Sequence, residues 1–389
     1  MSLKAHFRRF LDADPGRLHF AAHSHHLWPD VTFAAQEQCW RDAARLADRK
    51  WARIFGEVAP AVQQGLARVL NLARPEGIAF GPNTHGFVLR LLSCLPPGRP
   101  ARVLTTDGEF HSFARQVRRL EEDGLARVAR VPAEPFASFG ERFAEAAARG
   151  GHDMVYFSHV FYDSGYAVPD LAALVAAVPD PDTFVVIDGY HGFLALPTDL
   201  APLQERAFYL AGGYKYAMAG EGVAFLHAPP GYGPRPRDTG WFADFGALEG
   251  GEADAVSYGA DGARFLGATF DPAGLYRLRA VLEWLETIGV GVADVHAHVH
   301  ALQRLLVERL GDLGLESLHP GQLLVPVSEP GRGHFLTFRT REAERIHRSL
   351  LDRNVITDYR GDRLRLGFGL YHDEEDVERL SRVLQQALA

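Results

Sequence analysis

Residues 185–191 read Val-Val-Ile-Asp-Gly-Tyr-His, and residues 211–216 read Ala-Gly-Gly-Tyr-Lys-Tyr. The first stretch predicts a buried β-strand that ends in an acid, because a short β-branched run followed by Asp-Gly is typical of a strand and its turn. The second places Lys215 in a glycine-rich turn, 27 residues after Asp188 (215 − 188). Taken singly, such a lysine is usually a surface charge and such an aspartate a turn or cap. The functional prediction therefore rests on Asp188 and Lys215 occurring together.

An acid at a strand end and a lysine in a following turn are what pyridoxal 5'-phosphate requires. The lysine amine forms a Schiff base with the cofactor aldehyde. The carboxylate pairs with the pyridine nitrogen and keeps it protonated, so that the ring acts as an electron sink. The sequence therefore predicts pyridoxal 5'-phosphate as the cofactor, with Lys215 and Asp188 as catalytic residues.

Composition narrows the class of protein. The chain has 389 residues, 47% of them hydrophobic and 23% charged, which suits a large core with a smaller domain. The formal charge of −8 argues against nucleic acid or an anionic membrane as partner. No apolar run is long enough to span a membrane, and the first residues do not predict a signal peptide. Two cysteines, Cys39 and Cys94, without a CxxC pair favour a reducing cytoplasm over a disulfide framework.

The middle of the chain alternates short apolar strands with helical patterns, which predicts an α/β fold with a mainly parallel sheet. The expected helices span residues 33–55, 85–95 and 112–122, and the second begins at the N-cap residues Asn83 and Thr84. The expected strands are residues 102–105, 154–157, 184–187, 207–210 and 223–227.

After about residue 270 the pattern changes. Leucines from Leu275 to Leu285, with Ile288, mark one face of a long helix. The last hundred residues then read as helix, strands, helix, strands, helix, which predicts a small α+β domain. We therefore expect a large domain over residues 18–270 and a small C-terminal domain over 271–389, with residues 1–17 packing on the small one.

Further candidate residues surround the predicted lysine. Residues 81–86, Gly-Pro-Asn-Thr-His-Gly, precede a helix whose N-terminal N–H groups suit a phosphate. Phe110 follows a strand and could stack on the pyridine ring, although core packing is the commoner role for an aromatic. His191 lies three residues after Asp188, where a short loop could turn it toward the same ring.

Two more features bear on the substrate. Arg365 lies on an alternating strand and needs a partner, either a substrate carboxylate or a plain salt bridge. Residues 23–26, His-Ser-His-His, could hold a metal, but no second ligand cluster with suitable spacing accompanies them. A loop lining the cleft is the favoured interpretation, and no metal is expected.

The chain resembles the fold-type I pyridoxal phosphate enzymes of aminotransferase class V, and among them the kynureninases. The resemblance runs from about residue 18 to residue 388 and is sharpest at residues 188–191, 213–216 and 240–242. It implies a large domain with a mainly parallel sheet, a small C-terminal α+β domain, and a homodimer with active sites at the interface.

The resemblance also implies residue roles. Lys215 would carry the Schiff base and move the proton, Asp188 would hold the pyridine nitrogen, and His191 would lie near the ring. Arg365 would bind the substrate carboxylate, and Trp241 would line the pocket, from the other subunit if the dimer forms; His23 is a further substrate-binding candidate. The remaining cofactor contacts would come from Phe110 on the ring and from Thr84, His85, Tyr162, Tyr214 and Thr269 near the phosphate, the last of these across the dimer interface.

The sequence departs from the kynureninase pattern where a substrate side chain would be read. Residues 267–269 are Gly-Ala-Thr rather than Ala-Gly-Thr, and the usual asparagine near Gly267 is missing. Residues 22–26 also differ from the usual Gly-Asn-Ser-Leu-Gly. These changes leave the cofactor prediction intact and leave the substrate side chain open.

The favoured activity is kynureninase-like hydrolytic Cβ–Cγ cleavage of a small-molecule amino acid. A class V transamination with a keto acid is the first alternative. Cysteine desulfuration is disfavoured because neither cysteine lies in the late loop at residues 327–333. A non-catalytic scaffold on this fold would be expected to lose Lys215 or Asp188, and both are present.

Overall fold

The computed structural model describes residues 2–230, 234–249, 255–329 and 331–388. Its centre is a seven-stranded sheet in the order β2-β8-β7-β6-β5-β3-β4, in which β8 alone runs opposite to the other six strands. The predicted α/β class with a mainly parallel sheet is therefore confirmed, and all five predicted strands are present. The strands are β2 (Ile78–Gly81), β3 (Ala101–Thr106), β4 (Ala126–Val131), β5 (Met154–Ser158), β6 (Phe184–Asp188), β7 (Ala207–Gly212) and β8 (Ala224–His227).

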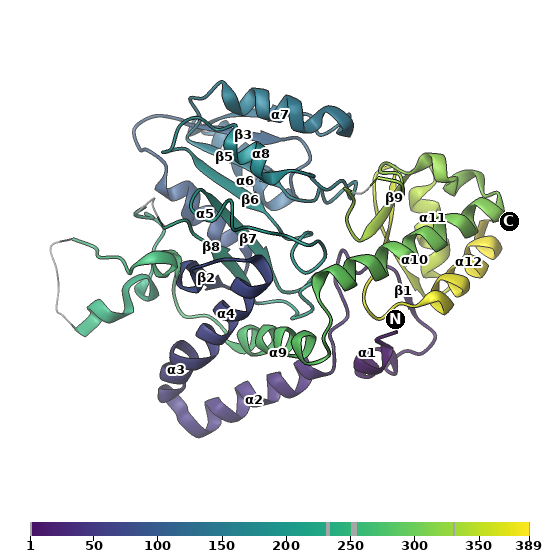
Figure 1. Ribbon diagram of the computed structural model, residues 1–389, viewed down its shortest axis with the longest axis horizontal. Coiled ribbons are helices and arrows are strands. Elements are labelled where there is room, and N and C mark those ends of the chain that lie inside the picture. The colour runs from purple at the N-terminus through teal and green to yellow at the C-terminus, as the bar shows by residue number, and fades with distance from the viewer. Residues whose placement is uncertain (1, 231–233, 250–254, 330, 389) are drawn as a thin grey trace.

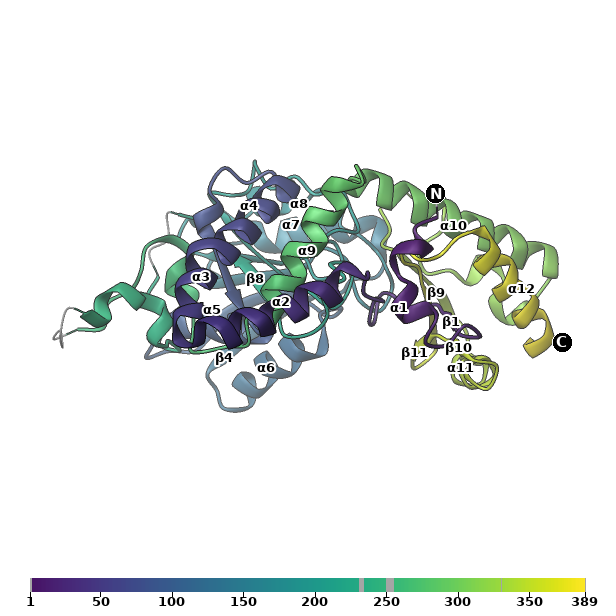
Figure 2. The same cartoon turned by 90° about the horizontal axis from the view of Figure 1, so that it is seen from below.

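Helices cover both faces of this sheet (Figures 1 and 2). Alternate residues of β6 show why its sequence is apolar throughout: Val185 and Ile187 belong to one core, and Val186 belongs to the other. Helices α5 (Thr84–Cys94) and α6 (His111–Glu122) pack on the face of Val186. The opposite face is covered by α4 (Ala59–Leu70), α7 (Phe139–Ala148), α8 (Leu171–Ala176) and α9 (Ala273–Thr287).

The helix predicted over residues 33–55 is broken, and this prediction was wrong in its extent. Helix α2 (Val31–Leu46) ends at Ala47, whose φ is 49°, and α3 (Lys50–Arg53) then leads through a π-helical turn into α4. The turn brings Arg53 Nε to 3.0 Å from the carboxylate of Asp42. In one continuous helix these residues would lie about 16 Å apart along the axis. The buried ion pair therefore requires the break.

A second apolar core lies to the right in Figure 1. It is built around a three-stranded antiparallel sheet in the order β11-β12-β9 and a short parallel pair, β1 with β10. The strands are β1 (Leu18–His19), β9 (Phe335–Arg339), β10 (Val355–Ile356), β11 (Asp358–Arg360) and β12 (Arg363–Gly367), and the helices are α10 (Val292–Leu313), α11 (Ala343–Leu351) and α12 (Glu374–Leu388).

The segments that join the two cores come from both ends of the chain. Helix α9 packs on α2 and α4, so its leucine face belongs to the larger core. The N-terminal segment, with the short α1 (Arg8–Leu11), crosses to the second core, where Lys4 pairs with Asp373 at 2.7 Å. The domain boundary at residue 271 stays a prediction.

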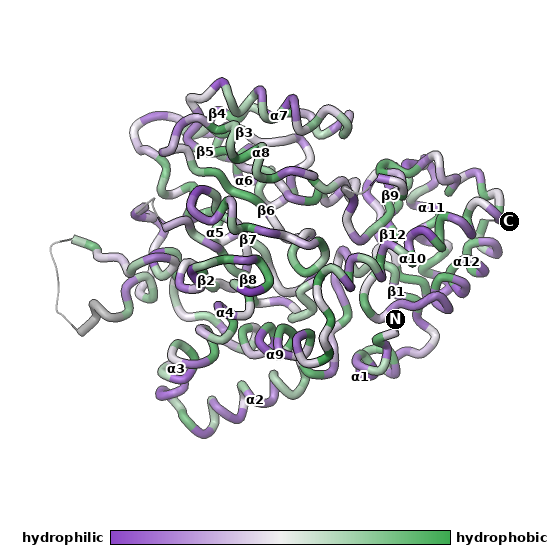
Figure 3. Tube along the Cα trace, viewed as in Figure 1, coloured by the Kyte–Doolittle hydropathy of each residue, from purple (hydrophilic) through white to green (hydrophobic). Residues whose placement is uncertain are grey.

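Hydropathy follows the layers of the fold (Figure 3). The central strands are apolar, whereas the outer helices carry polar residues on the side away from the sheet. Among the residues that the structure describes, no helix is both long and apolar enough to cross a membrane.

Candidate active site

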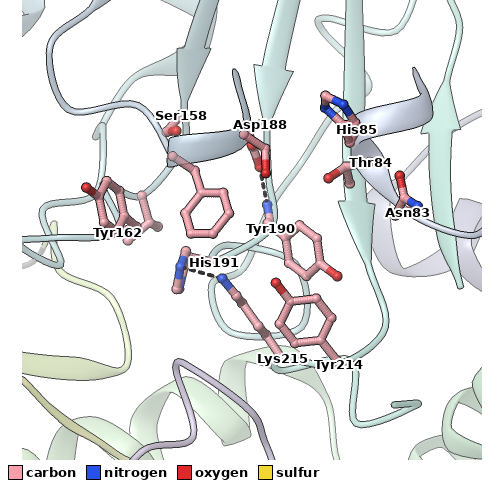
Figure 4. Close-up of a pocket in the computed structure, with 13 residues that line it drawn as sticks. Asn83, Thr84, His85, Ser158, Tyr162, Asp188, Tyr190, His191, Tyr214 and Lys215 are labelled. Carbon is pink, nitrogen blue, oxygen red and sulfur yellow. Dashed lines mark hydrogen bonds between the residues drawn. The ribbon is translucent and has the colours of Figure 1, made fainter. Parts of the chain in front are cut away.

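A pocket of about 270 Å³ lies at the carboxyl ends of β5, β6 and β7 (Figure 4). That edge of an open α/β sheet is where ligands usually bind, and the volume is near the lower end of the roughly 300–1,000 Å³ of small-molecule sites. The pocket is lined by Asn83, Thr84, His85, Phe110, Ser112, Ser158, Val160, Tyr162, Asp188, Tyr190, His191, Tyr214 and Lys215.

Asp188 is the last residue of β6 and lines the pocket at the end of this strand (Figure 4). Its carboxylate accepts hydrogen bonds from the Tyr156 hydroxyl and from the backbone N–H of Tyr190, both at 2.9 Å. Burial raises the pKa of this carboxyl, while the two donors and the nearby Lys215 favour its charged form. Its orientation is thus fixed by donors that leave one side of the group facing the cavity (Figure 4).

Lys215 follows β7 and is only 5% exposed. Its Nζ lies 2.9 Å from Nε2 of His191. Burial lowers the pKa of this lysine to about 7, and the charge of Asp188 opposes that shift. A substantial fraction of neutral amine at pH 7 is what a nucleophilic lysine needs.

Three aromatic rings surround the lysine. Its Nζ lies 5.1 Å from the ring centre of Phe110, 4.8 Å from that of Tyr190 and 5.4 Å from that of Tyr214. Phe110 is held edge-on against Tyr162, with ring centres 5.4 Å apart. The cavity between Asp188 and Lys215 is therefore flat-walled and aromatic, a shape that suits a planar ring.

The N-terminus of α5 forms the far end of the pocket. Asn83 caps the helix by accepting a hydrogen bond from the N–H of Gly86 at 2.9 Å. Thr84 and His85 begin the helix and line the pocket beside it (Figure 4). The hydroxyl, the first N–H groups and the positive end of the helix dipole make this end suitable for a phosphate.

Arg365 and His23 lie close to the lysine but do not line this pocket. Arg365 is 3% exposed; its Nη2 donates to Asp358 and its Nη1 to the carbonyl of Tyr162, while its Nε has no partner among the described residues. His23 is buried and stacks on Phe335, with ring centres 4.7 Å apart. Arg365 thus forms a salt bridge with Asp358, which is one of the two partners that the sequence left open. The Nε–H of its guanidinium has no partner among the described residues.

Trp241 and Thr269 lie outside the pocket as well. The indole Nε1 of Trp241 donates to the Thr269 hydroxyl at 3.2 Å, and Trp241 is 45% exposed. In a single chain they do not contribute to the site of Lys215, and their role at a neighbouring subunit stays a prediction.

Sequence reasoning missed part of the site. Tyr190, Ser158 and Asn83 line the pocket without having been singled out as site residues. Behind Asp188 lies Glu109, 3% exposed, which accepts hydrogen bonds from the hydroxyls of Ser158 and Thr106, both at 2.6 Å. Burial raises the pKa of Glu109 to about 8. Its place in Asp-Gly-Glu-Phe, directly before the stacking candidate Phe110, was the available signal.

The chain is similar to several known proteins. Residues 295–384 match the family model of the kynureninase C-terminal domain. The chain is 29% identical to isopenicillin N epimerase of Amycolatopsis lactamdurans over 81% of each chain. It is 23% identical to a probable cysteine desulfurase of Vibrio cholerae over 74% of this chain and 71% of that protein, and 29% identical to kynureninase of Pseudomonas fluorescens over 55% and 51%.

Solved structures share the fold at lower identity. A cystine C–S lyase in complex with cysteine persulfide aligns with a TM-score of 0.82 at 19% identity, over 95% of this chain and 97% of that one. A mutant of the same enzyme, with glycine covalently linked to its pyridoxal phosphate cofactor, aligns with a TM-score of 0.83 at 18% identity, over 97% and 98%. The chain therefore has the fold of the fold-type I pyridoxal phosphate enzymes, with relatives in aminotransferase class V and a C-terminal segment that matches the kynureninase model.

Proposed function

We propose that this protein is a pyridoxal phosphate-dependent enzyme that acts on an amino acid, and that it favours kynureninase-like hydrolytic cleavage of a Cβ–Cγ bond. One observation carries the proposal: a lysine buried to 5% exposure lies in an aromatic cavity together with a strand-end aspartate. The hydrogen-bond neighbour of this lysine is His191, whose Nε2 lies 2.9 Å from Nζ.

The residues present fit the cofactor. Lys215 would bind its aldehyde carbon, Asp188 its pyridine nitrogen, and Phe110 one face of its ring. Thr84 and the α5 N-terminus would hold the phosphate, with further donors from Tyr214 and His85. When bound, the pyridine ring supplies an electron sink that stabilises negative charge at the substrate Cα.

The protein's own groups supply the proton movements. Lys215, displaced by the substrate amine, would take the proton from Cα, since burial keeps its pKa low enough for a neutral amine near pH 7. His191, 2.9 Å from Lys215 Nζ, would hold the amine in place by hydrogen bonding. Asp188, fixed by Tyr156 and Tyr190, would keep negative charge opposite the ring nitrogen.

The substrate carboxylate would be bound by Arg365. This guanidinium comes from β12, inside the segment that matches the kynureninase model, and its Nε is unpaired among the described residues. Asp358 and the Tyr162 carbonyl hold the other two nitrogens and set the plane of the group. A planar, oriented guanidinium is suited to side-on recognition of a carboxylate.

Epimerisation is the second candidate, because isopenicillin N epimerase is 29% identical over 81% of both chains. It would use the same removal of the Cα proton by Lys215, followed by its return on the opposite face. Transamination by the same site remains a third possibility for an unknown amino acid and keto acid pair. Desulfuration through a cysteine is less favoured: Cys39 lies on α2 and Cys94 at the end of α5, and neither lines the pocket.

The deciding experiment incubates the cofactor-loaded protein with kynurenine and other γ-keto amino acids and measures alanine. The same amino acids are incubated in D2O to follow exchange and inversion at Cα, and cysteine is tested for sulfide release. Alanine formation supports the cleavage, and Cα inversion without alanine supports the epimerase. If borohydride fixes no cofactor onto Lys215 and the absorption band expected at about 410–430 nm is missing, the enzyme proposal itself is wrong.

A further inference from the structure

Three histidines meet where the second core joins the larger one. His296 and His300 lie one turn apart on the same face of α10, and His334 directly precedes β9. One ring nitrogen of each lies within 4.8 Å of those of the other two. His300 and His334 are buried and His296 is half-buried. This group is separate from residues 23–26, where the sequence had suggested and then disfavoured a metal.

We propose that His296, His300 and His334 bind one divalent transition-metal ion of the Zn²⁺ type, with a water molecule in the fourth position. The pairing of His296 and His300 at i and i+4 on one helix, with a third ligand from another segment, brings imidazoles together in the way that zinc sites require. Nothing in the proposed catalysis uses these residues.

The distances suit a tetrahedral ion. Bonds of about 2.0–2.1 Å from zinc to imidazole nitrogen place neighbouring nitrogens about 3.3–3.4 Å apart in a tetrahedron. Nδ1 of His296 and Nε2 of His334 are 3.3 Å apart. The other separations are no longer than 4.8 Å and would close by small rotations of the rings.

Two of the three histidines have the backbone partner that a ligating histidine usually has. His300 Nε2 lies 3.3 Å from the carbonyl oxygen of Arg332, and His296 also hydrogen-bonds to the backbone of Ala195. A ring N–H that donates to a backbone carbonyl fixes the tautomer and leaves the second nitrogen as a lone pair. His334 has an Nδ1 without a partner among the described residues.

Burial favours the neutral form of the three imidazoles, which is the form that a metal ligand needs. Burial lowers the pKa of His300 to about 3 and lowers the pKa of His334 and His296 as well. The positive charge of Arg332 repels a cation at this site. This guanidinium, however, donates hydrogen bonds to the carbonyl oxygens of Val327 and Glu329, at 2.6 and 2.7 Å. A hard ion such as Mg²⁺, which prefers oxygen ligands, is therefore not expected, whereas an ion that prefers imidazole is.

The position of the site gives the ion a structural role. His334 packs edge-on against Tyr216, with ring centres 5.1 Å apart, and Tyr216 follows the catalytic lysine candidate. Ala195, which contacts His296, belongs to the larger core, whereas α10 and β9 lead into the second one. An ion bound here would link the two cores directly behind Lys215.

The test uses the full chain without an affinity tag, stripped with a chelator and then titrated with Zn²⁺ by calorimetry and with Co²⁺ by visible absorption. We expect one ion per chain, the intense absorption of tetrahedral Co²⁺, and a higher midpoint of thermal unfolding with Zn²⁺. His300→Gln and, separately, His296→Gln should each weaken binding at least tenfold, while His319→Gln, at an exposed histidine, should not. If His300→Gln, at the buried position, does not fold, the loss of binding in His296→Gln decides whether the ion binds at this site.

Two results would overturn the proposal. One is the absence of Zn²⁺ binding by the stripped wild-type chain at concentrations up to those that precipitate the protein. The other is binding that persists unchanged in both His300→Gln and His296→Gln, which would assign the ion to surface histidines such as His25.

Discussion

Lys215 Nζ and His191 Nε2 lie 2.9 Å apart, and both side chains are buried. Burial lowers the pKa of each, and the positive charge of Lys215 lowers that of His191 further. Near pH 7 the pair therefore carries at most one positive charge, and the amine and the imidazole share a hydrogen bond. The arrangement gives the lysine amine one hydrogen-bond partner, while burial keeps a fraction of the amine neutral, as a nucleophile requires.

The cofactor-free protein should become more stable as the pH rises above 7. The pKa of Lys215 is about 7 in the folded chain and 10.5 as the ordinary value. Between these values the unfolded chain binds this proton and the folded chain does not, so the free energy of unfolding rises with pH. In Lys215→Met this contribution is absent. The difference in the free energy of unfolding between the two proteins should therefore change by a few kcal/mol between about pH 7 and pH 10.5. Urea unfolding at several pH values measures this difference. If the free energy of unfolding depends on pH in the same way in both proteins, the low pKa of Lys215 is contradicted.

Asp188→Asn should weaken the site without unfolding it. The side-chain oxygen can still accept a hydrogen bond from the Tyr190 N–H, so the local turn is retained. The negative charge opposite the ring nitrogen is lost, and we expect turnover to fall on the order of 100-fold, as for other preorganised charges in active sites. The fall is measured as the steady-state turnover of Asp188→Asn, together with its affinity for the cofactor. Asp182→Asn, an exposed acid before the same strand, is the control and should leave both unchanged.

The parts of the fold that the sequence predicted well are those where local pattern and tertiary burial agree. Strands β5 to β8 are buried on both faces, so their sequences are apolar throughout and bounded by turn residues. The pocket was predictable for the same reason, since Asp188, Phe110 and Lys215 follow strands whose carboxyl ends share one edge.

The parts that the sequence did not predict depend on contacts between distant segments. No glycine or proline marks the end of α2, and the break at Ala47 follows from the pairing of Asp42 with Arg53 and Tyr276. Glu109 could not be assigned from its own segment, because its partners Thr106 and Ser158 lie on two different strands. In the proposed metal site, His334 lies 34 residues after His300 and outside α10 (334 − 300), so no local spacing rule could unite it with the helical pair.

Asp42→Ala should destabilise the large core. This carboxylate is 1% exposed, and it accepts a hydrogen bond from the Tyr276 hydroxyl at 2.9 Å and pairs with Arg53 at 3.0 Å. Its removal leaves a buried hydroxyl and a largely covered guanidinium without their acceptor, which costs roughly 2–4 kcal/mol. Tyr276→Phe removes one donor and should cost only about 1 kcal/mol. Urea midpoints measure both, with the exposed Asp48→Ala as control; equal effects of Asp42→Ala and Asp48→Ala would contradict this account.

Arg365→Lys tests the proposed carboxylate clamp, and the same strand offers its control. Arg363 lies two residues earlier on the same face of β12, but its guanidinium pairs with Asp163 and with Glu134, the latter at 3.0 Å. A lysine keeps the charge and loses the planar fork, so Arg365→Lys should raise the KM for an amino acid by about 10- to 100-fold and change kcat much less.

Arg363→Lys should leave KM within a factor of about two, because its partners are carboxylates of the protein itself. Thermal unfolding of both variants separates a loss of binding from a loss of structure, since Arg365 also pairs with Asp358. Equal KM values for Arg365→Lys and the unaltered protein would show that Arg365 serves only its ion pair with Asp358, and the substrate carboxylate would then need another partner.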